Sequence, residues 1–245
     1  MTKRGLVGAW CPSIGATGFR LQDRSGRGNH CSMLNTASTS WQTSGGKIAF
    51  SHDGTDDRVF SSSFAMSAMG DQNNSFSLWI NPTTTSANTR PFGLGQFGVS
   101  FGLRFNFQNL EFLFGGTAAL SVAMTSATYA NRWTHVCGVA DASGARLFFD
   151  GVQVGTRSDT VSLSKTNGLG IGYRFGINSD FYSGFTDDFR IYARALTPPE
   201  IRQLYIGGRG FGLLPERPRR RSKAAGAAFK AFRARRQSQL IGGGL

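Results

Sequence analysis

Hydrophobic and polar residues alternate most strictly over residues 97–107. The odd-numbered positions hold Phe, Val or Leu, and the even-numbered positions hold Gly, Ser, Arg or Asn. Successive side chains of a strand point to opposite faces, so this alternation predicts a strand with one buried, aromatic face. The alternation resumes at Leu110, Phe112 and Phe114 after a Gln108-Asn109 turn, which predicts a β-hairpin.

Similar patterns, separated by turn residues, recur about every ten positions along most of the chain. Phe76, Leu78 and Ile80 form another inward face, which ends at Asn81-Pro82. A second hairpin is predicted around Asp150-Gly151, because this dipeptide tolerates the positive φ angles of a type I′ turn. This regular spacing is typical of a large antiparallel β-sandwich, and the predicted fold class is all-β.

One helix is predicted before the C-terminal region. Thr197 can cap its N-terminus, Pro198 and Pro199 suit its first turn, and Glu200 can complete a capping box. Its apolar side consists of Ile201, Leu204 and Tyr205.

Positive charge is concentrated near the C-terminus. The 245 residues include 27 Lys and Arg and 14 Asp and Glu, a net charge of +13. From Pro215 onward there are nine basic residues against Glu216 alone, a net +8, whereas residues 1–214 hold 18 basic and 13 acidic residues, a net +5. We therefore predict a sandwich domain over residues 1–206 and a Gly/Pro/Arg-rich linker with a basic amphipathic tail over residues 207–245.

Length and composition exclude several classes of protein. The chain is long enough for one large sandwich, and no apolar run reaches the roughly 18 residues that span a bilayer. The first residues do not show the apolar stretch of a secretory signal. Cys11, Cys31 and Cys137 are too few and too widely spaced for a disulfide framework or a metal knuckle. Three buried thiols are expected, with a Cys11–Cys31 bridge as the alternative.

Several segments, taken in order, resemble one family. They are GLVGAW (5–10), DRSGRGNH (23–30), AFSHDGTDDRV (49–59), FSLWINP (76–82), RWTHV (132–136), LFFDG (147–151), GLGIG (168–172), FTDDFRIY (185–192) and ALT (195–197). Together they resemble the laminin-G-like jelly roll of the concanavalin A-like lectin/glucanase superfamily over about residues 5–206. The resemblance implies two curved antiparallel sheets with a concave surface and rim loops. Because the superfamily includes lectins, other binding modules and glycoside hydrolases, the fold alone leaves the function open.

Catalytic chemistry is poorly supported by the residues. Glycoside hydrolysis normally needs two carboxyl groups, and hydrolases of this fold carry Glu-x-Asp-x-(x)-Glu on one strand. Here Glu111 is the only glutamate in the middle of the chain, and no second carboxylate shares its strand. His135 is expected to be a core residue, and His30 and His52 to be scaffold residues of turn-rich motifs. We expect no enzymatic activity and no catalytic residues.

Aspartates in glycine-rich turns suggest one structural calcium ion, and no other cofactor is expected. Calcium takes six to eight oxygen ligands, which converging loops can supply, and many proteins of the resembled family bind it. Asp23, Asp53 and Asp188 are the candidate ligands. The alternative is that these aspartates cap backbone N–H groups, or that Asp188 pairs with Arg190 or Arg58.

Candidate ligand-binding residues follow from the binding faces of the resembled fold, which use aromatic, amide and Arg side chains. They are Trp79, Arg104, Asn106 and Arg174, which lie out of phase with the inward positions or in loops. Trp79 can instead be partly buried beneath a loop. Trp10, Trp41 and Trp133 are assigned to the core.

The tail has three interpretations. Its arginines can contact phosphates, its apolar residues can fold on a protein partner or an anionic membrane, or it can be a disordered spacer. Ala225, Ala228, Phe229 and Phe232 fall on one helical stripe, which favours a docking peptide. The predicted docking residues are Arg219, Arg220, Arg221, Phe229, Phe232, Arg235 and Arg236.

These observations lead to a hypothesis of a non-enzymatic, virion-associated decoration or adhesion protein. The tail would dock to a phage or virus capsid or tail as part of an oligomeric assembly, and the sandwich would face outward and bind glycans. A free-standing bacterial lectin-like module, cytoplasmic or exported without a signal, is the alternative, and a glycoside hydrolase is a distant third. Nucleic acid is a minor candidate partner, through the tail alone.

Overall fold

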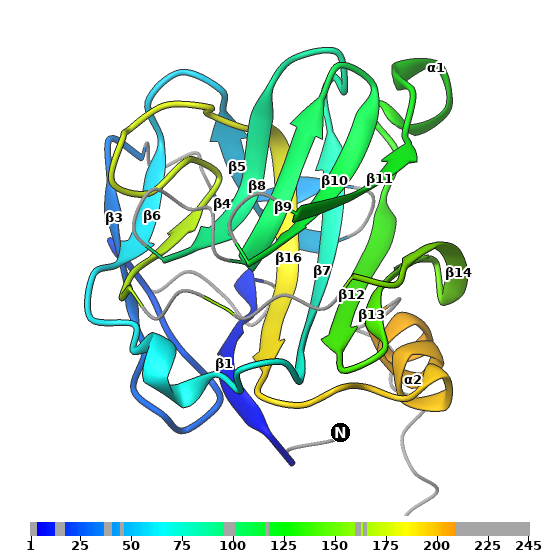
Figure 1. Ribbon diagram of the computed structural model, residues 1–245. Coiled ribbons are helices and arrows are strands. Elements are labelled where there is room, and N and C mark those ends of the chain that lie inside the picture. The colour runs from blue at the N-terminus through cyan, green and yellow to red at the C-terminus, as the bar shows by residue number, and fades with distance from the viewer. Residues whose placement is uncertain are drawn as a thin grey trace, which may run out of the picture. The chain divides into compact units, whose positions relative to one another are not determined.

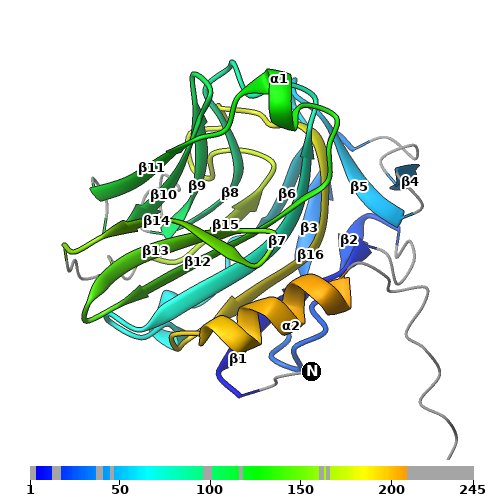
Figure 2. The same cartoon turned by 90° about the vertical axis from the view of Figure 1, so that its right-hand side faces the viewer.

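The structure is a two-layer antiparallel β-sandwich, as the sequence predicts (Figure 1). It is a computed structural model, and it describes residues 4–12, 18–36, 41–44, 47–95, 101–115, 118–159, 163 and 166–208. The two layers are seen side by side in Figure 2, with helix α2 lying outside one of them. We call the layer beside α2 sheet A and the other layer sheet B.

Sheet A has the order β14-β13-β12-β7-β16-β5-β4, with β1 paired to β16. Its strands are β1 (Leu6–Trp10), β4 (Trp41–Ser44), β5 (Lys47–Asp53), β7 (Asn74–Pro82), β12 (Thr134–Asp141), β13 (Gly144–Phe149), β14 (Val152–Arg157) and β16 (Ser183–Tyr192).

Sheet B has the order β11-β10-β9-β8-β15-β6-β3-β2. Its strands are β2 (Arg20–Leu21), β3 (Cys31–Leu34), β6 (Arg58–Ser61), β8 (Thr89–Leu94), β9 (Phe101–Asn106), β10 (Asn109–Phe114), β11 (Ala118–Ala123) and β15 (Leu169–Ile171). The helices are the 3-10 turn η3 (Met66–Ala68), α1 (Ser126–Tyr129) and α2 (Pro198–Gly208).

The main core lies between the sheets and is rich in phenylalanine. Phe76 of β7 packs edge-on against Phe92, Phe101 and Phe112 of sheet B, with ring centroids 4.9–5.8 Å apart. Edge-to-face contacts of this kind add to the gain from burying the ring area. The alternation seen in the sequence therefore places its aromatic side chains between the two sheets.

The β9–β10 hairpin confirms the prediction except at its turn. Phe107 and Gln108 form the turn, with φ angles of 45° and 67°, and Asn109 already belongs to β10. Phe107 is consequently 70% exposed, although the alternation predicts it to be buried. The start of the predicted strand, residues 97–100, lies outside the described residues.

Helix α2 covers part of the outer face of sheet A and creates a second, smaller core. Glu200 makes its half of the predicted capping box, since its carboxylate accepts hydrogen bonds from the Thr197 N–H and hydroxyl at 3.0 and 3.1 Å. Hydrogen bonds from Arg194 and Thr197 lower the pKa of Glu200 to about 2. The residues of this second core are Leu6, Ala9, Cys137, Val139, Phe148, Tyr192, Leu196, Ile201 and Leu204.

The remaining core predictions are partly confirmed. Trp10 is fully buried and stacks on Phe189 with ring centroids 5.3 Å apart. Trp41 and Trp133 are only half-buried, because Trp41 belongs to the edge strand β4 and the Trp133 indole N–H donates to Ser44 C=O of the same strand at 3.1 Å. Cys11, Cys31 and Cys137 are all buried thiols and not disulfide partners.

Candidate functional site

A hydrogen-bonded group of polar side chains lies on the outer face of sheet B. Arg104 and Asn106 of β9 point away from the core, and Glu111 lies opposite Arg104 on β10. Arg104 Nε donates to Glu111 Oε2 at 2.8 Å, and its Nη2 makes a second bond to the same oxygen. Asn106 Nδ2 donates to Glu111 Oε1 at 2.9 Å. Both carboxylate oxygens of Glu111 are therefore engaged in holding Arg104 and Asn106 in place.

A second group of charges comes from β8 and the loop between β15 and β16. Arg90 Nε donates to Asp180 Oδ2 at 3.0 Å, and Arg174 Nη1 lies 4.0 Å from the same oxygen. The loop is fixed by its backbone, because Arg90 N–H donates to Asp180 C=O at 2.9 Å and Arg174 N–H donates to Ser179 C=O at 2.8 Å. Asp180 thus joins two guanidinium groups.

The two groups adjoin each other. Thr89 and Phe105 are register partners on β8 and β9, and the register shifts between Thr89 and Phe92, so Arg90 lies in an irregular stretch of β8 next to Arg104 of β9. Burial lowers the pKa of Arg90, Asp180 raises it, and the positive charges of Arg174 and Arg104 lower it again. We call Arg90, Arg104 and Arg174 the arginine cluster.

The structure therefore brings Arg104 and Asn106 together through Glu111, and it places Arg174 in the second group, beside Asp180. The side chains of Arg104 and Arg174 are 29% and 28% exposed, so both reach solvent while being held by carboxylates. Sequence reasoning missed Arg90, Asp180 and the role of Glu111. The hairpin register could have paired Glu111 with Arg104, but no local signal connects Arg90 to Asp180, which is 90 positions away.

Trp79 is the exception, and its assignment as a ligand-binding residue is wrong. It points to the outer face of sheet A, as its phase in the strand predicts, but α2 covers this face. Trp79 is only 4% exposed and stacks on Tyr205 of α2, with ring centroids 5.8 Å apart and an interplanar angle of 24°. Its ring belongs to the packing of α2 against the sheet.

Asp23 and Asp188, two of the three predicted calcium ligands, have structural partners in the protein. The Asp23 carboxylate accepts hydrogen bonds from the backbone N–H groups of Ala9, Ser25 and Asn29 at 2.8–2.9 Å. Asp188 pairs through both oxygens with Arg190 at 2.7 and 2.8 Å. Both therefore fit the alternative interpretation of turn capping and ion pairing.

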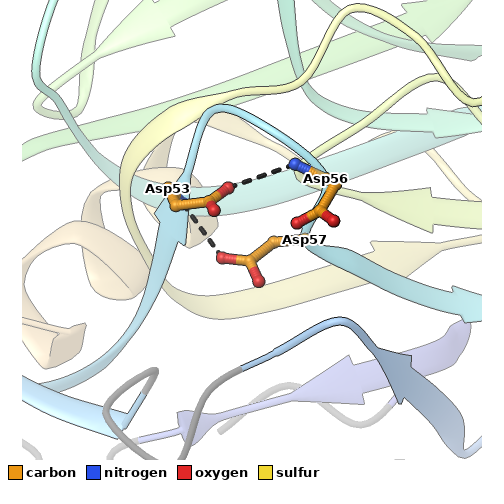
Figure 3. Close-up of side chains that lie close together, drawn as sticks. All are labelled: Asp53, Asp56 and Asp57. Atoms are coloured by element: carbon orange, nitrogen blue, oxygen red, sulfur yellow. Dashed lines mark hydrogen bonds between the residues drawn. The ribbon is translucent and has the colours of Figure 1, made fainter.

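Asp53, the third predicted ligand, belongs to a different acidic group (Figure 3). Asp53, Asp56 and Asp57 each offer a carboxylate oxygen, and these three oxygens lie within 4.8 Å of one another. The Asp53 carboxylate accepts hydrogen bonds from the N–H groups of Thr55 and Asp56, and Asp57 accepts one from the N–H of Asp53. Burial and the charges of Asp53 and Asp56 raise the pKa of Asp57, although the bond from Asp53 N–H opposes them.

Three crowded carboxylates of this kind are ligands that a hard cation prefers. If calcium binds here, millimolar calcium should raise the melting temperature and a chelator should reverse the rise, because the ion binds only the folded turn. Asp57→Asn should abolish the calcium-dependent rise in melting temperature. Asp188→Asn should lower the stability of the protein but keep this rise. Thermal melting with and without the chelator measures this, and identical curves for the wild type would refute the calcium prediction.

Two histidines and two cysteines, His52, His135, Cys31 and Cys137, are buried in the fold. His135 is fully buried and its Nε2 lies 2.9 Å from Ser77 Oγ, which confirms its place in the fold's interior. His52 is 2% exposed and its Nε2 lies 3.0 Å from Thr186 Oγ1. Burial lowers the pKa of His52 to about 3, and it raises the pKa of the Cys31 and Cys137 thiols. Groups held in these protonation states are unsuited to proton transfer or nucleophilic attack near pH 7.

A sandwich of two antiparallel sheets is the architecture of a jelly-roll domain. The chain belongs to the concanavalin A-like lectin/glucanases superfamily, whose laminin-G-type family matches residues 35–202. A search of curated proteins found no match. No helix within the described ranges is long and apolar enough to cross a membrane.

Solved structures share the fold at low sequence identity. The receptor-binding domain of botulinum neurotoxin mosaic serotype C/D has a TM-score of 0.65 and 15% identity, with 84% of this chain and 52% of that chain covered. The botulinum neurotoxin serotype D ligand-binding domain in complex with N-acetylneuraminic acid has a TM-score of 0.60 and 17% identity, with 84% of this chain and 51% of that chain covered. Trypanosoma rangeli sialidase in complex with sialic acid has a TM-score of 0.63 and 16% identity, with 84% of this chain and 33% of that chain covered. This chain thus spans about half of each toxin domain and a third of the sialidase.

The predicted docking tail lies outside the described residues. This applies to Arg219, Arg220, Arg221, Phe229, Phe232, Arg235 and Arg236. The proposed division at residues 206 and 207 likewise stays a prediction.

Proposed function

We propose that this chain is a non-enzymatic carbohydrate-binding domain whose site is the outer face of sheet B around Arg104, Asn106 and Arg174. The observation that carries the proposal is the fixed arrangement of these side chains, since Glu111 holds Arg104 and Asn106, and Arg174 lies beside Asp180 in a second group of charges. Guanidinium and amide groups supply N–H donors, and the Asn106 amide oxygen supplies an acceptor, which suits sugar hydroxyl groups. Two of the similar solved structures are described as complexes with sialic acid or N-acetylneuraminic acid, which supports this class of ligand.

The exposed ring of Phe107 strengthens the proposal. It follows Asn106 directly at the tip of the β9–β10 hairpin and is 70% exposed. Aromatic rings beside polar groups offer an apolar surface for a ligand that is polar at its edges. The alternation in the sequence predicts this residue to lie in the core, so sequence analysis did not identify it as a candidate ligand-binding residue.

A binding role is favoured over hydrolysis by the state of Glu111. Hydrolysis of a glycosidic bond normally uses one carboxyl group as acid and a second as base or nucleophile. Both oxygens of Glu111 accept hydrogen bonds from Arg104 and Asn106, so the carboxylate serves as a support for these two side chains. Glycoside hydrolysis therefore stays a distant alternative.

A glycan array probed with the full chain tests the binding proposal. Arg104→Ala should weaken binding of any glycan that the wild type retains by about tenfold or more, because a hydrogen bond to a charged group contributes about 1.5–3 kcal/mol. Arg146→Ala is the matched control, since Arg146 is 30% exposed and also paired to one carboxylate, Asp141, but lies on sheet A. The proposal fails if the wild type binds no glycan, or if both variants behave alike.

The biological setting that we propose is a phage or virus particle, with the domain as a decoration or adhesion protein anchored by its basic, hydrophobic tail. A free-standing bacterial lectin-like module is the alternative. The support is the sequence of the tail, with its net +8 and apolar stripe.

Truncation after Gly208 tests the anchor, because this boundary keeps Tyr205 on Trp79. The shortened chain should stay folded and fail to join particles of the phage or virus whose genes flank its own. Unchanged incorporation, measured in purified particles, would refute the anchor. Flanking genes that encode no particle proteins would favour the bacterial module.

A further inference from the structure

The turn of the β9–β10 hairpin has an unusual sequence for its backbone. Eight non-glycine residues within the described ranges have a positive φ angle, and six of them are Asn or Asp. Phe107 and Gln108 are the other two, with φ angles of 45° and 67°. Asn and Asp tolerate this conformation because their short polar side chains bond locally, whereas it is a strained outlier for a bulky residue. The backbone of this turn therefore does not account for a phenylalanine.

The hairpin between β13 and β14 shows the usual sequence for such a turn. Its turn residues, Asp150 and Gly151, have φ angles of 50° and 81°, and Asp-Gly is among the dipeptides that two-residue hairpins favour. The same chain thus makes a comparable turn with favourable residues and, at Phe107, with an unfavourable one. An observed backbone outlier of this kind indicates a role for the side chain that it carries.

The strained turn is tied by hydrogen bonds to two neighbouring segments of the chain. Gln108 N–H donates to Thr85 C=O, and Met124 N–H donates to Gln108 C=O, both at 2.8 Å. Within the turn, the side-chain amide of Asn109 donates to Phe107 C=O at 3.3 Å. Thr85 and Met124 are fully buried, so these bonds fix the turn to the interior of the sandwich. Phe107, whose side chain is 70% exposed, is therefore presented on a fixed backbone.

The two segments that hold the turn, residues 83–88 and 124–129, carry hydroxyl groups. They meet at Ser126 Oγ, which accepts a hydrogen bond from Thr85 N–H at 2.9 Å. The hydroxyl oxygens within 3.4 Å of Ser126 Oγ belong to Thr84, Thr85 and Ser86. Of the described residues, no other exposed large hydrophobic side chain lies in these segments or in the hairpin. The exposed ring of Phe107 is therefore a single aromatic surface in a polar region.

From these observations we infer that Phe107 stacks on the apolar C–H face of a neutral pyranose sugar. The face of an aromatic ring carries partial negative charge, which attracts the C–H groups on one side of a pyranose. Asn106 precedes Phe107, and its amide, held by Glu111, supplies hydrogen bonds to hydroxyl groups of the sugar. The inference rests on the proposed carbohydrate-binding function and names its class of substrate.

A sugar fits this surface better than a protein, a membrane or a nucleic acid. The core of a protein interface and the contact with a lipid surface both need several apolar side chains together, and here one ring stands alone. A nucleobase can stack on an aromatic ring, but its strand also brings phosphates that need basic partners. Residues 83–88, 106–109 and 124–129 contain no Lys or Arg.

The test measures stability and binding in one variant of the full chain. Phe107→Asn/Gln108→Gly converts the turn to Asn-Gly, a dipeptide strongly preferred in this turn. Relief of two strained residues should lower the equilibrium constant for unfolding by about fivefold or more, measured by urea unfolding. The same variant should bind the sugar about tenfold or more weakly, because the ring is gone. A loss of binding that accompanies a gain of stability cannot be caused by unfolding.

The probes are methyl β-galactoside, methyl β-glucoside and methyl N-acetyl-β-glucosaminide, and binding is followed by saturation-transfer NMR. We expect the wild type to bind at least one of them, with the strongest saturation on the ring C–H protons. Galactitol and sorbitol, which carry hydroxyl groups without a closed ring, should not compete.

Three single variants separate stacking from other effects. Phe107→Tyr keeps the aromatic face and should keep the binding within about threefold of the wild type. Phe107→Leu is apolar without this face and should lose as much binding as the Asn-Gly variant. Phe19→Ala removes another ring, which is 76% exposed, and should leave binding unchanged.

Each other outcome would overturn the inference. Unchanged or lower stability of the Asn-Gly variant would refute the strained turn, and full binding by Phe107→Leu would refute stacking. If the wild type binds glycans on the array but none of the three probes, or binds them without need of Phe107, the inference fails and the carbohydrate-binding function stands. Phe107-dependent binding of phosphatidylcholine vesicles or of oligothymidylate in place of sugar would assign the ring another ligand. Binding of no sugar in either experiment would refute the proposed function itself.

Discussion

Replacing Trp79 by alanine should lower the free energy of unfolding by about 3–5 kcal/mol, the range for a buried Trp. The ring is 4% exposed and lies between sheet A and α2, where it stacks on Tyr205 and approaches His135 at 5.3 Å. Its removal leaves a cavity that α2 can fill only by shifting. Denaturant unfolding of wild type and variant, followed by circular dichroism, measures the difference.

Phe107→Ala is the control for this prediction. Phe107 is also aromatic, but it is 70% exposed, so its removal should change stability by about 0.5 kcal/mol or less. If the site on sheet B binds glycans as proposed, Phe107→Ala should weaken binding and Trp79→Ala should not do so in the folded fraction. A stability loss below about 1 kcal/mol for Trp79→Ala would contradict the packing of α2 described above.

The second large effect that we expect is loss of stability in acid, caused by His52. Its pKa is about 3 in the folded protein because burial disfavours the charged ring, whereas the unfolded value is near 6.5. Above pH 6.5 the ring is neutral in both states and its full contribution is present. Between pH 6.5 and 3 only the unfolded chain gains the proton, so stability falls by about 1.4 kcal/mol per pH unit. The loss reaches about 3 kcal/mol by pH 4.5.

Urea unfolding at a series of pH values tests this prediction. His52→Gln can keep a hydrogen bond to Thr186 and cannot titrate, so its stability should fall less steeply between pH 6.5 and 4.5. His30→Gln, which alters a ring that accepts a hydrogen bond from Asp23 N–H at 3.1 Å, keeps His52 and should retain the steep fall. Parallel curves for the wild type and His52→Gln would contradict the assignment.

The backbone pairing of β9 and β10 could be predicted because alternation and turn residues are local signals. Even there the turn begins at Phe107 and not at Gln108, since two consecutive positive φ angles close the hairpin one residue earlier. The alternation holds only while the backbone stays extended, and it gives no information on the residue at which the strand stops. That single position decides whether Phe107 is a core residue or a surface aromatic.

The candidate site was predictable in part for the same reason. The alternation along β9 correctly predicts that Arg104 and Asn106 point outward. The alternation along β7 correctly predicts that Trp79 lies on the opposite face from Phe76. Which outer face is covered depends on where α2 packs, and this tertiary contact leaves no local trace in the sequence. The same limit applies to Arg90 and Asp180, which are in contact although they lie 90 positions apart in the sequence.

The covering of sheet A by α2 makes the domain one-sided. The last described element lies against the outer face of sheet A, and the arginine cluster lies on the outer face of sheet B, on the other side of the core. Copies fixed to a common support from the α2 side would all present their arginines outward. Many such sites can engage a glycan-coated surface together, so the array can bind strongly even when each site binds weakly.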